Sequence, residues 1–93
     1  MKKLTVFYLE SCPYCIKAKK AEREIKTSNT SLQKVEIEWI EESLHPDIAD
    51  AYDYYRVPSV FDGKTKLYEC SPKDDYNTIK NNFEKAMKTI AEQ

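Results

Sequence analysis

Two cysteines lie two residues apart near the N-terminus, in the tetrapeptide Cys12-Pro13-Tyr14-Cys15. An apolar run, residues 4–9, precedes them, and a segment with helical spacing follows. Two thiols at this spacing at the start of a helix can form and break a disulfide bond with each other. Proline suits the first helical position because its missing N–H would have no partner there. The spacing therefore indicates a redox-active dithiol.

The two thiols are expected to differ in their surroundings. Cys12 would be the N-cap of the helix, where free N–H groups and the positive end of the helix dipole favour the thiolate. The thiolate is the nucleophile in disulfide exchange. Cys15, one turn further on, is expected to be more buried and able to attack a mixed disulfide formed at Cys12.

A zinc site is the main alternative for a pair of cysteines at this spacing. A closed structural zinc site takes four Cys or His ligands. The only other candidates are Cys70 and His45, and neither is paired at ligand spacing. We therefore predict no metal site.

The composition predicts one small domain over residues 1–93, with a formal net charge of −1. This charge gives no electrostatic reason to expect nucleic-acid binding, and no segment is apolar for long enough to span a membrane. Met1-Lys2-Lys3 and residues 4–9 resemble a signal peptide, but an apolar run of six residues is short for one. Three cysteines, an odd number, are not typical of a disulfide-stapled secreted domain. We expect a cytoplasmic monomer, with residues 4–9 as a strand.

The first half of the chain predicts two strands and two helices. The run 4–9 predicts a central strand, and a helix should extend from Pro13 to about Lys26. Residues 35–39 alternate apolar and acidic side chains, which predicts a half-exposed edge strand. A short helix should begin near Pro46, with four residues on one face: Ile48, Ala51, Tyr52 and Tyr55.

The second half predicts a hairpin and a last helix. Strands 59–61 and 66–68 flank a turn that contains Gly63. The helix should open with Ser71 as cap and Pro72 in the first position, and Asp74 would close a capping box. The order β-α-β-α-β-β-α makes the first two strands parallel and predicts an α/β fold, a four-stranded mixed sheet with helices on both faces.

Two motifs resemble the thioredoxin superfamily, and within it most closely the glutaredoxins. One is Cys12-Pro13-Tyr14-Cys15, typical of dithiol glutaredoxins; the other is the segment 52–61, which contains Val57-Pro58. The resemblance implies a minimal thioredoxin fold with a cis proline at position 58. It also implies a thiol-disulfide oxidoreductase in which Cys12 is the nucleophile and Cys15 resolves the mixed disulfide.

The resemblance also implies substrate-binding residues. The Val57 backbone beside Pro58 would pair with an extended substrate, and Tyr14 and Arg56 would contact it, although either could be a surface residue without a role. The resemblance further places Asp74 and Asp75 where related proteins hold the glutathione amino group, and helix capping is the alternative for both. Disulfide-containing proteins are the expected substrates, with no bound cofactor and glutathione as co-substrate.

Three positions depart from the glutaredoxin pattern. Leu9, followed by Glu10, replaces a Lys or Arg that would meet a glutathione carboxylate. The Gly-Gly pair after the fourth strand is absent, and Asp53 replaces a loop glycine, for which a left-handed backbone would be needed. The first two departures favour a thioredoxin-reductase-dependent redoxin as the alternative. A glutathione-assisted iron–sulfur module and a non-catalytic partner domain are further hypotheses.

Overall fold

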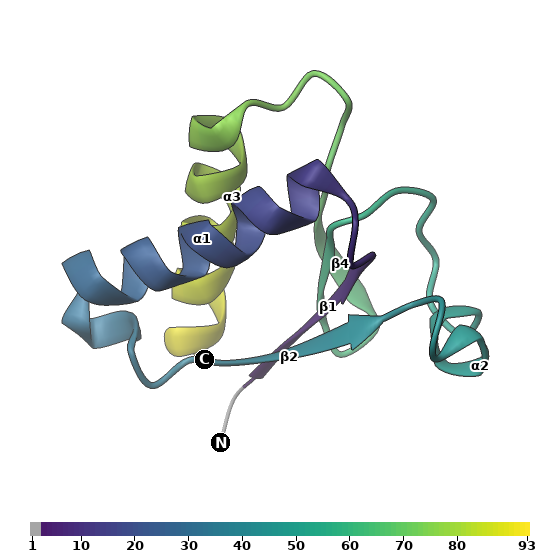
Figure 1. The fold of residues 1–93 in the computed structure, drawn as a ribbon. Helices are drawn as coiled ribbons and strands as arrows, with labels where there is room; N and C mark the ends of the chain where they lie inside the picture. Colours follow the sequence, from purple (N-terminus) through teal and green to yellow (C-terminus); the bar gives the residue numbers. More distant parts are fainter. Residues whose placement is uncertain (1–2) are drawn as a thin grey trace.

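The structure is a computed structural model that describes residues 3–93. Met1 and Lys2, where the signal-like pattern begins, lie outside the described residues. The elements in chain order are β1 (Lys3–Tyr8), α1 (Pro13–Ser28), a 3-10 turn η1 (Thr30–Leu32), β2 (Glu36–Glu41), α2 (Pro46–Ala49), β3 (Ser59–Asp62), β4 (Thr65–Glu69) and α3 (Tyr76–Ala91), shown in Figure 1.

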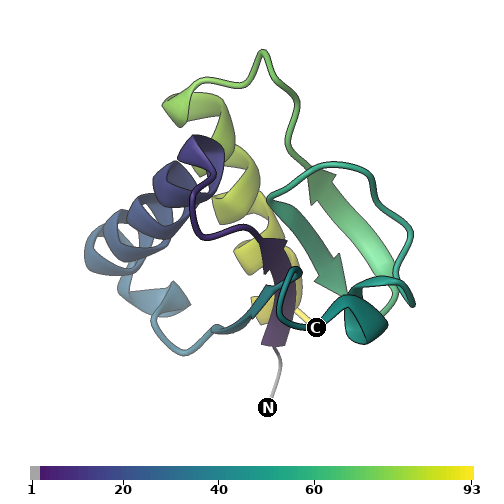
Figure 2. The ribbon, with the colours of Figure 1, turned by 45° about the vertical axis from the view of Figure 1, so that its right-hand side comes forward.

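The four strands form one mixed sheet in the order β2-β1-β3-β4. Strand β1 runs parallel to β2, in a register from Lys3 opposite Glu36 to Tyr8 opposite Glu41. It runs antiparallel to β3, which forms the hairpin with β4. Helices α1 and α3 cover one face, and the short α2 lies on the other (Figures 1 and 2). The predicted α/β fold is confirmed, with β1 central and β2 at an edge.

The core lies between the sheet and the pair α1–α3. Alternate residues of β1, Leu4 and Val6, face it and are fully buried. Helix α1 contributes the small Ala18 and Ala21 and the larger Ile25, and α3 contributes large side chains spaced by three or four residues. The α3 members are Ile79, Phe83, Met87 and Ile90.

Aromatic rings cover the opposite face of the sheet. Phe7 stacks on Tyr54 with ring centroids 4.9 Å apart, and Tyr52 lies at 4.7 Å. Helix α2 is therefore shorter than predicted: it ends at Ala49, and Tyr55 is 90% exposed. The helical face expected to unite Tyr52 with Tyr55 does not form, because the chain instead places alternate residues, 52 and 54, against Phe7.

The start of α3 also differs from the prediction. Its N-cap is Asp75, whose carboxylate accepts a hydrogen bond from the N–H of Thr78 at 2.8 Å. Ser71 and Asp74 instead close a turn, because the Asp74 carboxylate accepts from the N–H of Ser71 at 3.0 Å and from the Tyr68 hydroxyl at 2.5 Å. The tertiary contact with Tyr68 keeps Asp74 outside the helix.

One backbone expectation is wrong. Asp53 does not adopt a left-handed conformation, since no residue other than glycine within 3–93 has a positive φ. Gly63 does, with φ of 59°, in the hairpin turn where a side chain would strain the backbone.

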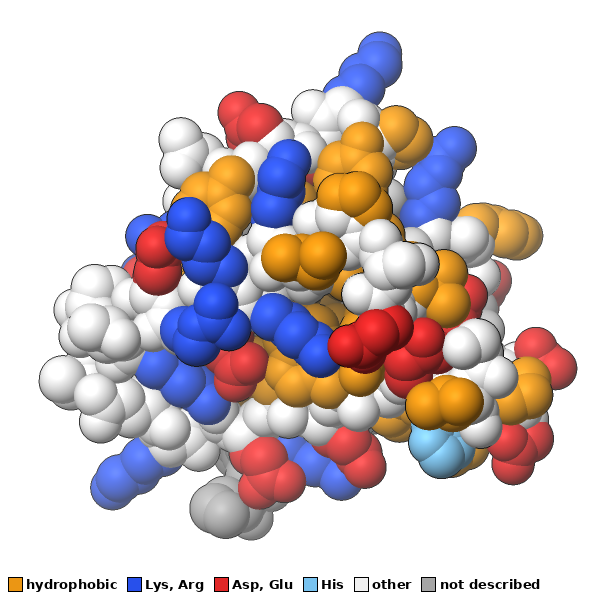
Figure 3. Space-filling view, viewed as in Figure 1, with side chains coloured by type: hydrophobic (Ala, Val, Ile, Leu, Met, Phe, Trp, Pro, Cys, Tyr) orange, Lys and Arg blue, Asp and Glu red, His pale blue; other side chains and the backbone are white. Residues whose placement is uncertain are grey.

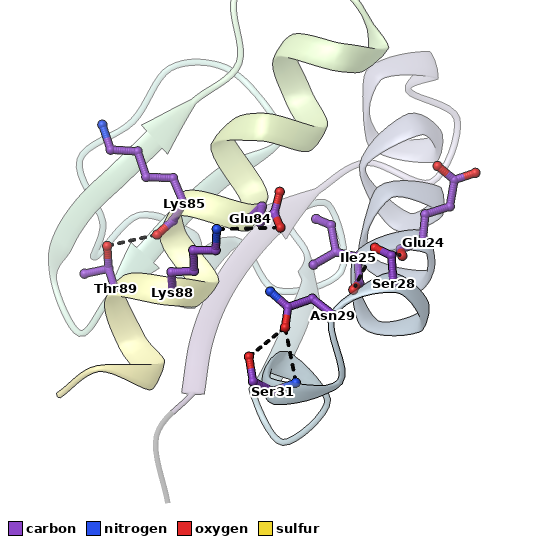
Figure 4. A network of polar contacts seen from close by, with 9 residues as sticks. All are labelled: Glu24, Ile25, Ser28, Asn29, Ser31, Glu84, Lys85, Lys88 and Thr89. Carbon is purple, nitrogen blue, oxygen red and sulfur yellow. Dashed lines mark hydrogen bonds and ion pairs between the residues drawn. The ribbon is translucent and has the colours of Figure 1, made fainter.

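Polar contacts close the connection between α1 and β2, at the end of α1 far from the cysteines (Figure 4). The Asn29 side chain accepts hydrogen bonds from the N–H and the hydroxyl of Ser31, at 3.2 and 2.6 Å. Nearby, α3 carries an exposed Lys88–Glu84 pair at 3.8 Å. Within residues 3–93, no helix is both long and apolar enough to cross a membrane.

Candidate active site

The two cysteines of the motif lie at the first turn of α1. Cys12 is the N-cap, and its carbonyl accepts from the N–H groups of Cys15 and Ile16, each at 3.1 Å. Cys12 is half-buried, whereas Cys15 is 1% exposed. All three cysteines of the chain are free thiols. The arrangement therefore presents one accessible thiol and one buried thiol a turn apart, as the sequence predicted.

Burial also separates the two thiols in their chemistry. Removal from water, the largest cause, together with the neighbouring Cys12 raises the pKa of the Cys15 thiol to about 12, although a hydrogen bond with the Leu9 backbone opposes the shift. Cys15 is therefore a protonated thiol at neutral pH.

The loop before β3 lies against Cys12. The peptide bond between Val57 and Pro58 is cis. The Val57 carbonyl oxygen lies 3.9 Å from the Cys12 Sγ, at the length of a weak sulfur hydrogen bond. Pro58 is buried and Val57 half-buried. A backbone segment is thus held directly beside the accessible thiol.

A carboxylate at the end of β4 holds this loop. Glu69 accepts from the N–H groups of Tyr55 and Arg56 at 2.8 and 2.7 Å, and pairs with Lys66 at 2.6 Å. Partial burial alone would raise the Glu69 pKa, but Lys66 and the two N–H groups outweigh it and lower the pKa. Sequence reasoning missed Glu69, and no local pattern marks it, because its partners lie 13 and 14 residues away.

Tyr14 connects the motif to the segment before α3. Its hydroxyl donates to the Pro72 carbonyl oxygen at 2.9 Å, and its half-buried ring packs against the core. The position within the motif is therefore less exposed than the sequence suggested.

Asp74 and Asp75 are both engaged within the fold. Asp75 caps α3, and Thr78 lowers its pKa by hydrogen bonding. Asp74 accepts hydrogen bonds from the Ser71 N–H and the Tyr68 hydroxyl. Burial is the main cause that raises the pKa of the Tyr68 hydroxyl, and the hydrogen bond to Asp74 is the second. Capping and turn closure thus account for both carboxylates, and neither lines the groove beside Cys12.

The third cysteine lies at the same site. The Cys70 N–H donates to the Pro58 carbonyl at 3.0 Å, and its side chain is 3% exposed. Burial raises the pKa of the Cys70 thiol, and the Asp74 and Cys12 charges act in the same direction. Cys70 thus contacts Pro58, and Cys12 contacts the adjacent Val57, so the same loop lies against both cysteines.

A groove of about 250 Å³ opens beside this loop. Six of the residues that line it are Leu9, Tyr14, Glu42, Arg56, Val57 and Cys70. The fold therefore brings together four of the residues predicted to bind substrate, Tyr14, Arg56, Val57 and Pro58, around the loop and its groove. The Arg56 side chain is exposed. In the described part of the chain, no group of three or more His, Cys, Asp or Glu side chains could hold a metal ion.

Comparison with solved structures shows what this architecture resembles. Thioredoxin 1 from the thermophilic eubacterium Thermosipho africanus TCF52B superposes with a TM-score of 0.56, over 94% of this chain and 96% of that chain. The chain has a thioredoxin fold. The sequences are 16% identical, so the similarity concerns the fold alone. No protein-family model and no curated protein sequence matches the chain.

Proposed function

We propose that this thioredoxin-fold protein is a thiol-disulfide oxidoreductase whose reactive dithiol is Cys12 and Cys15. The observation that carries the proposal is the position of Cys12. Its half-buried thiol stands at a helix N-terminus, beside the buried Cys15 and 3.9 Å from the Val57 carbonyl. Such surroundings favour a nucleophilic thiolate next to a backbone that an extended substrate could pair with.

The reaction takes place in two exchanges. The Cys12 thiolate attacks one sulfur of the substrate disulfide, which breaks that bond and releases the other sulfur as a thiolate. Cys15 loses its proton and attacks the Cys12 sulfur of the mixed disulfide, which releases the second substrate thiol. The substrate gains two electrons and two protons, and the protein is left with a Cys12–Cys15 disulfide. Two molecules of a thiol such as glutathione, or a reductase, return the two electrons.

For the electron donor we propose glutathione, with a glutaredoxin-like activity on protein disulfides and glutathione mixed disulfides. The support is the Cys-Pro-Tyr-Cys motif and the groove beside Cys12, which offers the exposed Arg56. A thioredoxin reductase is the second candidate, favoured by the apolar Leu9 and the carboxylate of Glu42 in the same groove. A carboxylate near an anionic tripeptide costs about 1 kcal/mol or less when exposed to water.

The roles of the thiols are tested by three serine variants. Cys12→Ser should abolish disulfide reduction, and Cys15→Ser should accumulate a mixed disulfide at Cys12 that mass spectrometry detects. Cys70→Ser is the matched control, since it removes a buried thiol beside the same loop, and it should retain activity. An active Cys12→Ser variant would disprove the proposal.

The donor is tested by NADPH oxidation during insulin reduction. One reaction contains glutathione and glutathione reductase, and the other contains thioredoxin reductase alone. A faster rate in the first supports a glutaredoxin-like protein, and a faster rate in the second supports a redoxin served by the reductase.

A further inference from the structure

The charges of the chain are unevenly distributed. Residues 35–55 contain seven Asp or Glu and no Lys or Arg, whereas α1 contains five Lys or Arg and two Glu. In the space-filling view, basic side chains gather over α1, while acidic and hydrophobic side chains mix towards α2 (Figure 3). We call residues 41–55 the acidic shoulder. Its carboxylates belong to Glu41, Glu42, Asp47, Asp50 and Asp53.

Large apolar side chains are exposed on the same shoulder. Leu44 is 73% exposed, Ile48 39% and Tyr55 90%. Scattered exposed apolar residues are ordinary, but these three lie within twelve positions of one segment. Ile16, near Cys12, is the only other large hydrophobic residue exposed in the part of the chain that the structure describes. An apolar surface bordered by charge is typical of a contact with another polypeptide.

The shoulder is continuous with the candidate active site. Glu42 and Tyr55 line the groove beside Cys12, and both also line a hollow of about 440 Å³ on the shoulder. Pro46 and Asp50 lie in the same hollow. A chain bound at Cys12 can therefore extend onto the shoulder without leaving the surface.

The carboxylates of the shoulder have no basic side chain as a partner among the ion pairs of residues 3–93. Glu41 accepts from the N–H groups of Glu10 and Ser43, and Glu42 accepts from the Tyr54 hydroxyl at 2.6 Å. These bonds fix the positions of two negative charges without neutralising them. Among residues 3–93, Lys64 lies against the shoulder, where its ammonium group donates to the Ala51 carbonyl at 2.7 Å, and the exposed Arg56 lines the groove that Glu42 also lines.

We propose that the acidic shoulder binds the polypeptide that flanks the reactive disulfide of a protein substrate, and selects Lys or Arg together with apolar residues there. The inference rests on the proposed function, because it assigns the substrate class of the same dithiol. Fixed negative charges beside the groove attract a cationic segment and raise its rate of association. The exposed Leu44 and Tyr55 provide apolar contact area for its side chains.

The test uses three peptides of equal length, each with one cysteine in a disulfide with thionitrobenzoate. Two leucines flank the cysteine in all three, and the charged positions carry Lys, Glu or Ser. With fully reduced protein and no other reductant, the absorbance of released thionitrobenzoate gives the second-order rate constant of the first exchange for each peptide. At low salt, we expect the Lys peptide to exceed the Glu peptide by about tenfold or more. Salt near 0.5 M should reduce this ratio, since it screens exposed charges.

Two triple variants with the same net charge locate the effect. Asp47→Asn/Asp50→Asn/Asp53→Asn removes three of the five shoulder carboxylates and should lower the Lys-to-Glu ratio by severalfold. Glu36→Gln/Glu84→Gln/Glu92→Gln neutralises three carboxylates on other surfaces and should leave the ratio near that of the unmodified protein.

The outcomes separate the inference from the proposed function. Equal rates for the Lys and Glu peptides, or an unchanged ratio in the shoulder variant, would overturn the inference while reduction of the Ser peptide upholds the oxidoreductase. A shoulder variant that changes only the sedimentation of the protein would assign the surface to a second copy and also overturn it. Failure to reduce any peptide would overturn the proposed function, and the inference with it.

Discussion

Glu69 holds the backbone of Arg56, whose N–H donates to the Glu69 Oε2 at 2.7 Å. The adjacent N–H of Tyr55 donates to the same oxygen at 2.8 Å. One carboxylate at the end of β4 thus positions the loop that presents Val57 to Cys12. Glu69 has no proposed chemical role, but it helps to determine the geometry of the candidate active site.

Removal of this carboxylate should therefore impair turnover. Glu69→Ala leaves two backbone N–H groups without their acceptor, a change that costs about 1–3 kcal/mol where the groups are shielded from water. We expect a lower free energy of unfolding and a severalfold lower kcat/KM on a peptide disulfide. Lys66→Ala, which removes only the ion-pair partner, is the control and should have a smaller effect. Equal losses in the two variants would mean that the ion pair, not the loop contact, matters.

The same carboxylate should make stability depend on pH. The folded protein lowers the pKa of Glu69, so the unfolded chain binds the proton more tightly. The stabilisation is fully present above the unfolded-state pKa of about 4.3 and is lost as pH falls through the lower folded-state value. The difference in unfolding free energy between the unmodified protein and Glu69→Gln should shrink as pH falls from 5 to 3. A constant difference would argue against the charge as its cause.

The three thiols should react with iodoacetamide in a definite order. Cys12 is half-buried at the helix start, whereas Cys15 and Cys70 are 1% and 3% exposed and burial raises the pKa of both. Peptide mapping after brief alkylation of the reduced protein should find the first modification at Cys12. Denaturant should make all three thiols react. Early modification of Cys70 would mean that the loop opens readily.

The second exchange should accelerate with pH. Burial is the largest cause that raises the pKa of Cys15, so below the raised value the thiolate fraction increases about tenfold per pH unit. With thionitrobenzoate bound to Cys12, its release by Cys15 should speed up from pH 6 to pH 8 without reaching a plateau. The Cys15→Ser variant shows the background rate. A rate independent of pH would mean that deprotonation of Cys15 does not limit the step.

A positive charge at position 9 should favour glutathione. Leu9 lines the groove beside Cys12, and lysine there would attract the carboxylates of the tripeptide. We expect Leu9→Lys to raise the glutathione-coupled rate a fewfold, as befits an exposed ion pair of about 1 kcal/mol or less. Asn81→Lys adds the same charge on the exposed side of α3 and should change nothing. An unchanged rate in Leu9→Lys would place glutathione elsewhere.

Two variants can separate the two suggested roles of Asp75, which are helix capping and binding of the glutathione amino group. Asp75→Ala removes the cap of α3 and should lower the free energy of unfolding by about 1 kcal/mol, whereas Asp75→Asn keeps a capping oxygen and should be near neutral. Chemical denaturation measures both. If Asp75→Asn nevertheless raises KM for glutathione, the carboxylate also binds the amino group of the tripeptide.

Local sequence patterns were sufficient to predict the type and order of the main helices and strands, and the position of Cys12 and Cys15 at the start of α1. The apolar run of β1, Pro13 after the N-cap Cys12, and Gly63 in the hairpin turn each specify structure through neighbours a few residues away. The parallel pairing of β1 and β2 followed from the order of the elements, because a helix joins the two strands. For this reason the fold, and the placement of Cys12 and Cys15 at the start of α1, could be predicted from the sequence.

Contacts between distant residues decided the rest. The start of α3 moved to Tyr76 because Tyr68 holds Asp74 in a turn, and α2 stopped at Ala49 because Tyr52 and Tyr54 pack on Phe7. Glu69 accepts hydrogen bonds from the loop before β3, and Cys70 donates one to Pro58. These residues lie too far apart in the sequence for a local pattern to predict their contacts. Such contacts depend on which side chains the closed sheet brings together, and only the tertiary structure determines that.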